Sequence, residues 1–285
     1  MEEVLRIYNL CKQYPTFRLQ DVSFAVEKGM IIGFIGRNGA GKTTTLKSIM
    51  NLVHPDSGEI RFFGMELGER EQEIKQRIGY ATGGINYYHR KRIHEIIQVT
   101  KMFYPSWDDA ACKHYLEGFS LDPGKRLMEL SEGMKVKFNL TLALSHHAEF
   151  LILDEPTSGL DPVSREELLE IFLELAAQGV SILFSTHITS DLEKCADAIT
   201  YIQKGQIVGS RRMEDFVAQY RLVKVSAELT PAQRELALGV RRSKEGQTVL
   251  IPAEQENRVR ELFADKAVEM IPADLETIMV HLEGN

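Results

Sequence analysis

The sequence predicts an α/β fold with a parallel β-sheet, followed by a smaller α+β domain. Two observations lead to this prediction. Continuous apolar runs at 30–35, 150–153 and 180–184 are typical of strands buried on both faces, as parallel strands are. Helical segments separate these runs, and this alternation builds a parallel sheet. Because ligands of such sheets bind at the carboxyl ends of the strands, we expect functional residues there.

The first part of the chain predicts strands, a loop and a helix in that order. Alternating apolar residues predict two strands, near 4–10 and 22–26, ahead of the buried strand at 30–35. A glycine-rich loop follows, and then a helix over 44–52. A short segment of antiparallel type is expected at 58–63.

The middle of the chain, from about 85 to 145, is predicted to be mostly helical, with two proline-containing breaks. A further helix is expected between the second and third buried strands. Asp161 is its predicted N-cap, Pro162 occupies its first position, and Gly179 ends it.

The pattern changes after about residue 220, so we divide the chain into domains at 1–220 and 221–285. The second part carries no dense glycine or carboxylate motif and no polybasic run. We interpret it as a small α+β domain. Its predicted strands lie at 222–227, 246–251 and 267–271, and its predicted helices at 254–263 and 273–282.

Composition excludes several classes of protein. The 285 residues carry a formal net charge of −7, which makes a nucleic-acid partner a poor prediction. The three cysteines match no metal-ligand spacing and no disulfide framework, so we expect a reducing compartment. The start of the chain does not resemble a secretory signal, and no apolar run approaches the ~20 residues of a membrane span. Any membrane role is therefore expected to come through a partner.

The glycine-rich loop matches the phosphate-binding pattern G-x-x-x-x-G-K-[ST] from Gly36 to Thr43. The loop places backbone N–H groups around phosphate oxygens, and the following helix presents its positive N-terminus to the same anion. Lys42 adds a point charge for the outer phosphates, and the Thr43 hydroxyl can bind Mg²⁺. The alternative is a chance glycine-rich turn. The loop predicts nucleotide binding but leaves the reaction open, because kinases, GTPases and transport ATPases share it. The loop residues expected to bind the nucleotide are Gly36, Asn38, Gly39, Gly41, Lys42 and Thr43.

Two acids and a histidine follow the later buried strands. Asp154 and Glu155 end the strand at 150–153, where unpaired charge is costly unless it holds a cation or does chemistry. Asp154 suits a Mg²⁺ contact, and Glu155 suits a general base that polarises the attacking water. His187 follows the strand at 180–184 and could bond the γ-phosphate or orient the water. The alternatives are an acidic turn that faces solvent and a histidine that caps a helix.

Further motifs resemble one family, the nucleotide-binding subunits of ABC transporters. Residues 130–134 (LSEGM) resemble the family's signature, commonly LSGGQ, and residues 154–161 (DEPTSGLD) resemble its Walker B and D-loop segment. Thr186-His187 is similar to its switch histidine. Tyr14 stands where the family places an aromatic that stacks on adenine. The resemblance covers roughly residues 1–220.

The resemblance implies the fold, the reaction and the cofactors. The fold would be a P-loop NTPase with an ABC-type antiparallel β subdomain and a helical subdomain, the latter at about 85–145. The activity would be hydrolysis of ATP with Mg²⁺, in which Lys42, Glu155 and His187 are catalytic. Thr44 would join the phosphate contacts, and Asp154 the metal site.

The resemblance also implies partners. In the family, the signature of one subunit completes the ATP site of a second ATPase subunit; here it would do so through Ser131, Gly133 and Met134, with Asp161 in the adjoining loop. The second subunit would be either an identical copy or a related ATPase. The other partner would be an integral membrane permease. The short helical region and the small C-terminal domain look similar to those of ATPase subunits of bacterial exporters, so this permease would be that of an exporter. The chain would then lie on the cytoplasmic face of the cell membrane.

One family feature is missing. The family usually has a glutamine soon after a strand such as 77–81, whereas this chain has Gly83-Gly84, with Asn86 as a weak candidate. The departure bears on metal geometry and on coupling to the membrane subunit. The basic run 89–92 is either a solvated face or a docking surface for that subunit.

Two other functions stay open at this point. A soluble ABC-type ATPase with a regulatory or assembly role would have the same site. A P-loop kinase would leave the LSEGM and SGLD segments unexplained. For single residues, Ser131 could be only a helix N-cap, and Tyr14 only a packed surface aromatic.

Overall fold

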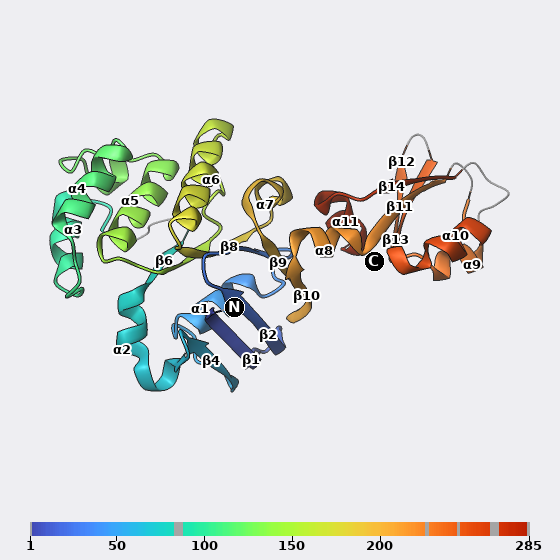
Figure 1. Ribbon diagram of the computed structural model, residues 1–285, viewed down its shortest axis with the longest axis horizontal. Coiled ribbons are helices and arrows are strands. Elements are labelled where there is room, and N and C mark those ends of the chain that lie inside the picture. The colour runs from blue at the N-terminus through green and yellow to red at the C-terminus, as the bar shows by residue number, and fades with distance from the viewer. Residues whose placement is uncertain (1, 83–87, 226–227, 244–245, 263–267, 284–285) are drawn as a thin grey trace. The chain divides into compact units, whose positions relative to one another are not determined.

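The computed structural model describes residues 2–82, 88–225, 228–243, 246–262 and 268–283 (Figure 1). The chain separates into two compact units, 1–210 and 211–285. Among the described residues, no helix combines the length and the apolar character needed to cross a membrane.

The first unit is built on a six-stranded sheet with the strand order β10-β9-β3-β8-β7-β6. Its central strands β3, β7 and β8 are parallel, and every residue in them is buried, as their apolar runs predict. The strands are β3 (Ile31–Ile35), β6 (Ile78–Thr82), β7 (Phe150–Asp154), β8 (Ser181–Thr186), β9 (Ala198–Gln203) and β10 (Gln206–Arg212).

A second, antiparallel sheet of order β2-β1-β4-β5 packs against the first and shares its core. Phe24 stacks on Phe34 with ring centroids 5.5 Å apart, and Phe62 contacts Phe150 at 6.1 Å. The stack of Phe24 on Phe34 packs the antiparallel sheet against the end of β3 that leads into the glycine-rich loop. The strands are β1 (Glu3–Gln13), β2 (Arg18–Glu27), β4 (Ser57–Phe62) and β5 (Met65–Glu66).

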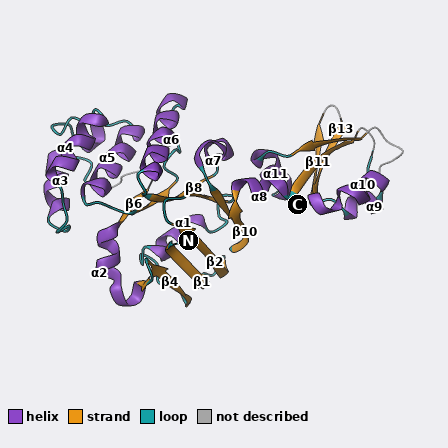
Figure 2. Ribbon diagram, in the orientation of Figure 1, coloured by secondary structure: helices purple, strands orange, loops and turns teal. Residues whose placement is uncertain are grey.

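Helices connect successive strands of these sheets (Figure 2). The helix after β3 begins at Lys42, two residues before its predicted start, because the glycine-rich loop runs directly into its first turn. Asp161 caps α6 as predicted: its carboxylate accepts hydrogen bonds from the N–H groups of Val163 and Ser164. The helices are α1 (Lys42–Ile49), α2 (Leu67–Arg77), α6 (Pro162–Ala177) and α7 (Thr189–Cys195).

A helical portion lies between β6 and β7, in the predicted region, and has a hydrophobic cluster of its own. Figure 1 shows α3, α4 and α5 gathered there. Ile93, Leu116, Leu127 and Phe138 are buried in this cluster, so these helices pack on one another. The elements are α3 (Ile93–Lys101), α4 (Asp109–Gly118), the 3-10 helix η1 (Leu127–Glu129) and α5 (Glu132–Ser145).

The second unit is an antiparallel sheet of order β12-β13-β11-β14 with short helices. It begins before the predicted boundary at residue 220, because the buried Phe216 of α8 packs its ring 5.5 Å from that of Tyr220. Strand β12 and helices α8 and α9 correspond to no predicted element. The elements are α8 (Met213–Ala218), β11 (Tyr220–Val225), α9 (Pro231–Glu235), β12 (Gly239–Ser243), β13 (Gly246–Pro252), η2 (Ala253–Gln255), α10 (Glu256–Leu262), β14 (Val268–Pro272) and α11 (Leu275–Leu282).

Candidate active site

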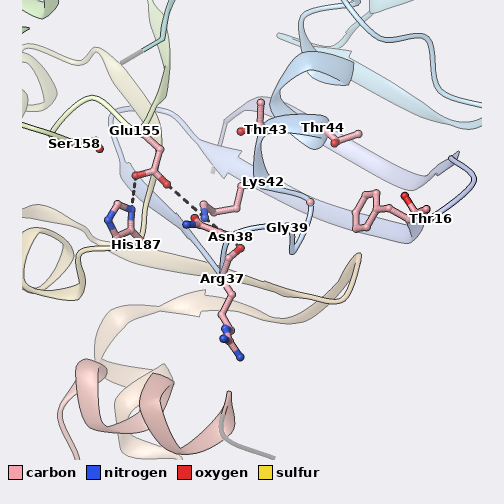
Figure 3. A pocket seen from close by; sticks show the side chains of 12 residues that line it. Thr16, Arg37, Asn38, Gly39, Lys42, Thr43, Thr44, Glu155, Ser158 and His187 are labelled. Carbon is pink, nitrogen blue, oxygen red and sulfur yellow. Dashed lines mark hydrogen bonds and ion pairs between the residues drawn. The ribbon is translucent and has the colours of Figure 1, made fainter. Parts of the chain in front are cut away.

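A pocket of about 660 Å³ lies where the loops after β3, β7 and β8 meet, at the carboxyl ends of these parallel strands (Figure 3). Most of the predicted phosphate-loop residues line it, together with the predicted base and the histidine. The lining residues are Thr16, Phe17, Arg37, Asn38, Gly39, Gly41, Lys42, Thr43, Thr44, Glu155, Ser158 and His187.

The loop requires glycine at two positions for steric reasons. A Cβ on Gly36 would lie 2.3 Å from the carbonyl oxygen of Ile202. Gly41 has φ +115°, and a Cβ there would lie 2.6 Å from Leu19. Gly41 is also the N-cap of α1, so the loop delivers the N-terminus of that helix to the pocket. The first turn of a helix has backbone N–H groups without partners inside the helix, which makes this end suited to an anion.

Lys42 is almost fully buried, at 6% exposure, yet its ammonium is directed into the loop. Its Nζ donates a hydrogen bond of 2.7 Å to the carbonyl oxygen of Gly36 and lies 3.4 Å from Glu155 Oε1. A buried ammonium needs such partners, because it has lost its hydration. The side chain is therefore held at the centre of the pocket.

Glu155 joins Lys42 to His187. One carboxylate oxygen faces Lys42, and the other accepts a hydrogen bond of 2.8 Å from His187 Nδ1 (Figure 3). Because a carboxylate only accepts, Nδ1 carries the proton in this bond and Nε2 stays free to accept, unless the imidazole is protonated. The structure thus brings the three predicted catalytic side chains into one connected row.

Thr43 and Asp154 lie beside this row. Thr43 Oγ1 is 3.4 Å from Asp154 Oδ1, and the same carboxylate oxygen accepts a 2.5 Å hydrogen bond from Ser185 Oγ. Burial, followed by the charge of Asp154, raises the pKa of Tyr80 to about 12, so this phenol stays neutral beside the carboxylate. The donor set fits Mg²⁺, which prefers oxygen ligands and binds through one or two carboxylates together with substrate phosphates.

Six predicted nucleotide contacts are not among the residues that line this pocket: Tyr14, Gly36, Ser131, Gly133, Met134 and Asp161. Ser131, Gly133 and Met134 stand at the start of α5, where Ser131 Oγ accepts a hydrogen bond of 3.2 Å from the Met134 N–H. Ser131 is therefore the N-cap of α5. Asp161 likewise caps α6 and is absent from the pocket lining. A single copy of the chain does not bring the start of α5 or Asp161 to Lys42.

Tyr14, the residue expected to stack on adenine, is not among the residues that line the pocket. Its ring faces Lys12, whose Nζ lies 5.9 Å from the ring centroid. Phe17, three residues later, lines the pocket in its place together with Thr16. Both aromatics belong to the turn between β1 and β2, so the sequence alone could indicate either one as a lining residue. The conformation of the turn determines that Phe17, and not Tyr14, lines the pocket.

Three further lining residues were given no role in the sequence analysis: Thr16, Arg37 and Ser158. Arg37 belongs to the phosphate loop itself. Ser158 belongs to the turn after Glu155, where its N–H donates to the Glu155 carbonyl oxygen. Gly83-Gly84 and Asn86, considered in place of the missing glutamine, lie outside the described residues.

Comparisons with known proteins agree with this geometry. The sequence model of the ABC transporter family matches residues 19–158. The bacitracin transport ATP-binding protein BcrA of Bacillus licheniformis is 33% identical over 73% of this chain and 69% of its own length. The linearmycin resistance ATP-binding protein LnrL of Bacillus subtilis is 31% identical over 82% of this chain and 80% of its own length.

A solved structure of an ATP-binding subunit of an ABC transporter superposes with a TM-score of 0.69 at 30% identity. The superposition covers 76% of this chain and 92% of that one. A match that spans nearly the whole of this chain also exists. The ABC transporter ATP-binding protein YtrB of Bacillus subtilis is 29% identical over 92% of this chain and 91% of its own length.

Proposed function

The chain belongs to the ABC transporter family of ATP-binding subunits, and from this premise we propose that it powers an exporter by hydrolysing ATP in the pocket around Lys42. ATP binding, ATP hydrolysis and a role in transport through a membrane permease follow from the family. The soluble alternative without transport is not supported, because these relatives are named as parts of transporters or of drug resistance.

The observation that carries the mechanism is the bridge of Glu155 between Lys42 and His187. We assign to Glu155 the acceptance of a proton from the attacking water, a general-base role worth typically ~10²–10⁴-fold in rate. His187 holds one carboxylate oxygen of Glu155 and contacts the γ-phosphate. Lys42 exchanges its carboxylate and carbonyl partners for phosphate oxygens, which are stronger acceptors for a buried ammonium.

The remaining pocket residues hold the nucleotide. Backbone N–H groups of the loop and of the first turn of α1 bind the phosphates, and Phe17 stacks on the base in place of Tyr14. Thr43 and Asp154 would hold Mg²⁺, which when bound neutralises charge on the transferring phosphoryl group. The proposed nucleotide-binding set comprises the lining residues Asn38, Gly39, Gly41, Lys42, Thr43 and Thr44, together with Gly36, whose carbonyl oxygen accepts the Lys42 hydrogen bond.

A second ATPase subunit is proposed to complete the site. The N-terminus of α5 carries Ser131, Gly133 and Met134, and none of them lines the pocket around Lys42 of the same chain. A helix N-terminus attracts anions. A head-to-tail pair would bring this end of α5 to the partner's γ-phosphate, with Asp161 near the junction.

The permease is proposed to dock on the α3 surface, an apolar surface at the C-terminal end of α3. It is defined as Val99 of that helix and the residues Met102 and Phe103 that follow it. Met102 is 83% exposed and Phe103 is 69% exposed, which is unusual for large apolar side chains that lie close together. The basic run 89–92 precedes this helix and is exposed. Docking here would place the chain on the inner face of the cell membrane. Export is proposed because relatives are named for bacitracin transport, linearmycin resistance and Nod factor export.

The test of the proposed mechanism is Glu155→Gln. The amide keeps the size of the side chain but cannot accept the proton, so ATP should still bind while turnover falls by at least about 10²-fold. Stable ATP should then hold two subunits together, which light scattering would detect as a dimer. Hydrolysis at the wild-type rate would contradict the role of Glu155.

A further inference from the structure

Ser185 is not among the residues that line the pocket. It is the fifth residue of β8, fully buried, and stands opposite Phe34 of β3 on one side and Asp154 of β7 on the other. Its hydroxyl is thus enclosed by the two strands that carry the phosphate loop and the acids.

The Ser185 hydroxyl is hydrogen-bonded to both acids. Its Oγ donates a 2.5 Å hydrogen bond to Asp154 Oδ1 and accepts a 3.0 Å hydrogen bond from the Glu155 N–H. The same N–H lies 3.1 Å from the Ser185 carbonyl oxygen. A carboxylate can only accept and a backbone N–H can only donate. The single proton of the hydroxyl therefore points to Asp154, and the hydroxyl oxygen accepts from the Glu155 N–H.

We infer that Ser185 is a positioning residue that orients the Mg²⁺-binding carboxylate of Asp154 and the backbone of the general base Glu155 through one hydroxyl group. The inference rests on the proposed function, because it uses the roles assigned there to Asp154 and Glu155.

The bond to Asp154 fixes the rotation of its carboxylate. Asp154 Oδ1 accepts the hydrogen bond from the Ser185 hydroxyl and lies 3.4 Å from Thr43 Oγ1. Asp154 Oδ2 has no hydrogen-bond partner among the residues that the structure describes. Rotation about the Cβ–Cγ bond is ordinarily soft. Holding Oδ1 on Ser185 removes this freedom and keeps the carboxylate directed as the metal site requires.

The bond from Glu155 supports an unfavourable backbone conformation. Glu155 has φ +53°, a left-handed value that is uncommon for residues other than glycine. This conformation aims its side chain at Lys42 and His187. Because Ser185 supplies both acceptors of the Glu155 N–H, it stabilises the turn that places the base.

The chain offers a matched control on the same strand. Ser181, the first residue of β8, is also fully buried, and its hydroxyl accepts a hydrogen bond of 2.9 Å from the Gly29 N–H, away from the pocket. Ser185→Ala and Ser181→Ala therefore remove the same group at the same burial. Ser185→Thr keeps the hydroxyl, and Ser185→Cys keeps the shape but is a much weaker donor.

Two readouts are made on the purified full chain: kcat for ATP, and the Kd of a non-hydrolysable ATP analogue with Mg²⁺ and with EDTA, by calorimetry. For Ser185→Ala we expect kcat to fall about tenfold and the gain in affinity from Mg²⁺ to shrink at least about threefold. Binding in EDTA should stay within about twofold of wild type, and Ser185→Thr should recover most of both losses. Ser181→Ala should lower the melting temperature alone.

The inference is overturned if Ser185→Ala matches Ser181→Ala in kcat and in the Mg²⁺ gain. If Ser185→Ala does not fold, Ser185→Cys gives the same comparison. Glu155→Gln, measured alongside, separates two failures. Hydrolysis by Glu155→Gln at the wild-type rate would refute the proposed function itself. If Glu155→Gln loses hydrolysis while Ser185→Ala matches Ser181→Ala in kcat and in the Mg²⁺ gain, only the role of Ser185 is refuted.

Discussion

Single side chains in this pocket are held by partners from distant parts of the sequence. Glu155 adopts a left-handed backbone conformation that costs about 1–3 kcal/mol for a residue with a Cβ. The turn after β7 keeps it there through the carbonyl and hydroxyl oxygens of Ser185. Strain at the proposed base is consistent with a site in which function, and not local propensity, sets the geometry.

The choice between Phe17 and Tyr14 gives a prediction at this scale. Phe17→Ala should weaken ATP binding about tenfold, because stacking of a base on an aromatic ring is worth ~1–3 kcal/mol. Tyr14→Ala is the control and should bind ATP nearly as wild type, since Tyr14 lies outside the pocket lining. Calorimetry with ATP and with inorganic triphosphate separates the two contributions.

Triphosphate lacks a base, so its affinity should not change in Phe17→Ala. If Tyr14→Ala loses ATP affinity and Phe17→Ala does not, Tyr14 is the residue that stacks on the base, as the family resemblance implies.

At the scale of elements, the junction of β3, the glycine-rich loop and α1 decides whether phosphate can bind. β3 is anchored on both sides, by β8 and β9, and by the stack of Phe34 on Phe24. The loop between this fixed strand and the first turn of α1 can close only with glycine at Gly36 and Gly41. The rigid strand and the helix N-terminus thus define the anion site together.

Gly41→Ala tests this junction. Alanine would be strained at φ +115°, by about 1–3 kcal/mol, and its Cβ would press on Leu19 and Phe17. We expect a lower melting temperature and at least about tenfold weaker ATP binding. Gly64→Ala is the control.

Gly64 also has a positive φ, +78°, but a Cβ there meets nothing within 4 Å, and it is not part of the pocket lining. Its alanine variant should lose stability while keeping ATP affinity. Equal loss of affinity in both variants would show that the effect is only one of stability.

At the scale of the whole molecule, two features of the first unit are the basis of the proposed partners: the N-terminus of α5, which lies outside the pocket lining, and the exposed apolar α3 surface. The N-cap of α5 and the α3 surface are parts of the first unit that one copy leaves unused. The second unit has its own core, built around Val223, Val249 and Val259.

The α3 surface supplies the prediction at this scale. A charge on Met102 or Phe103 would oppose burial in an apolar interface, so Met102→Glu with Phe103→Glu should abolish co-purification of a membrane protein from native membranes. Basal ATP hydrolysis should persist, because neither residue lines the pocket.

Leu173→Glu on α6, also an exposed apolar position, is the matched control and should keep the membrane partner. Mass spectrometry of the captured chains gives the readout. Retention of the same multi-span partner by the double variant would refute docking through α3.

Part of this molecule follows from the sequence alone. Apolar runs determine the buried strands β3, β7 and β8, and the spacing of glycines, lysine and threonine determines a phosphate loop, because these signals arise from neighbours along the chain. Asp161 as a helix cap belongs to the same class of local signal. Short elements such as β12 and α9 were missed, since a few residues hold too little periodicity to identify them.

Only the tertiary structure decided which side chains meet. Phe17 reaches the pocket and Tyr14 does not, although both belong to one turn. Ser185 lies beside Asp154 because parallel pairing of β7 and β8 sets that register across 31 positions of sequence. Distances of this kind depend on the packing of strands far apart in the chain, which no local pattern encodes.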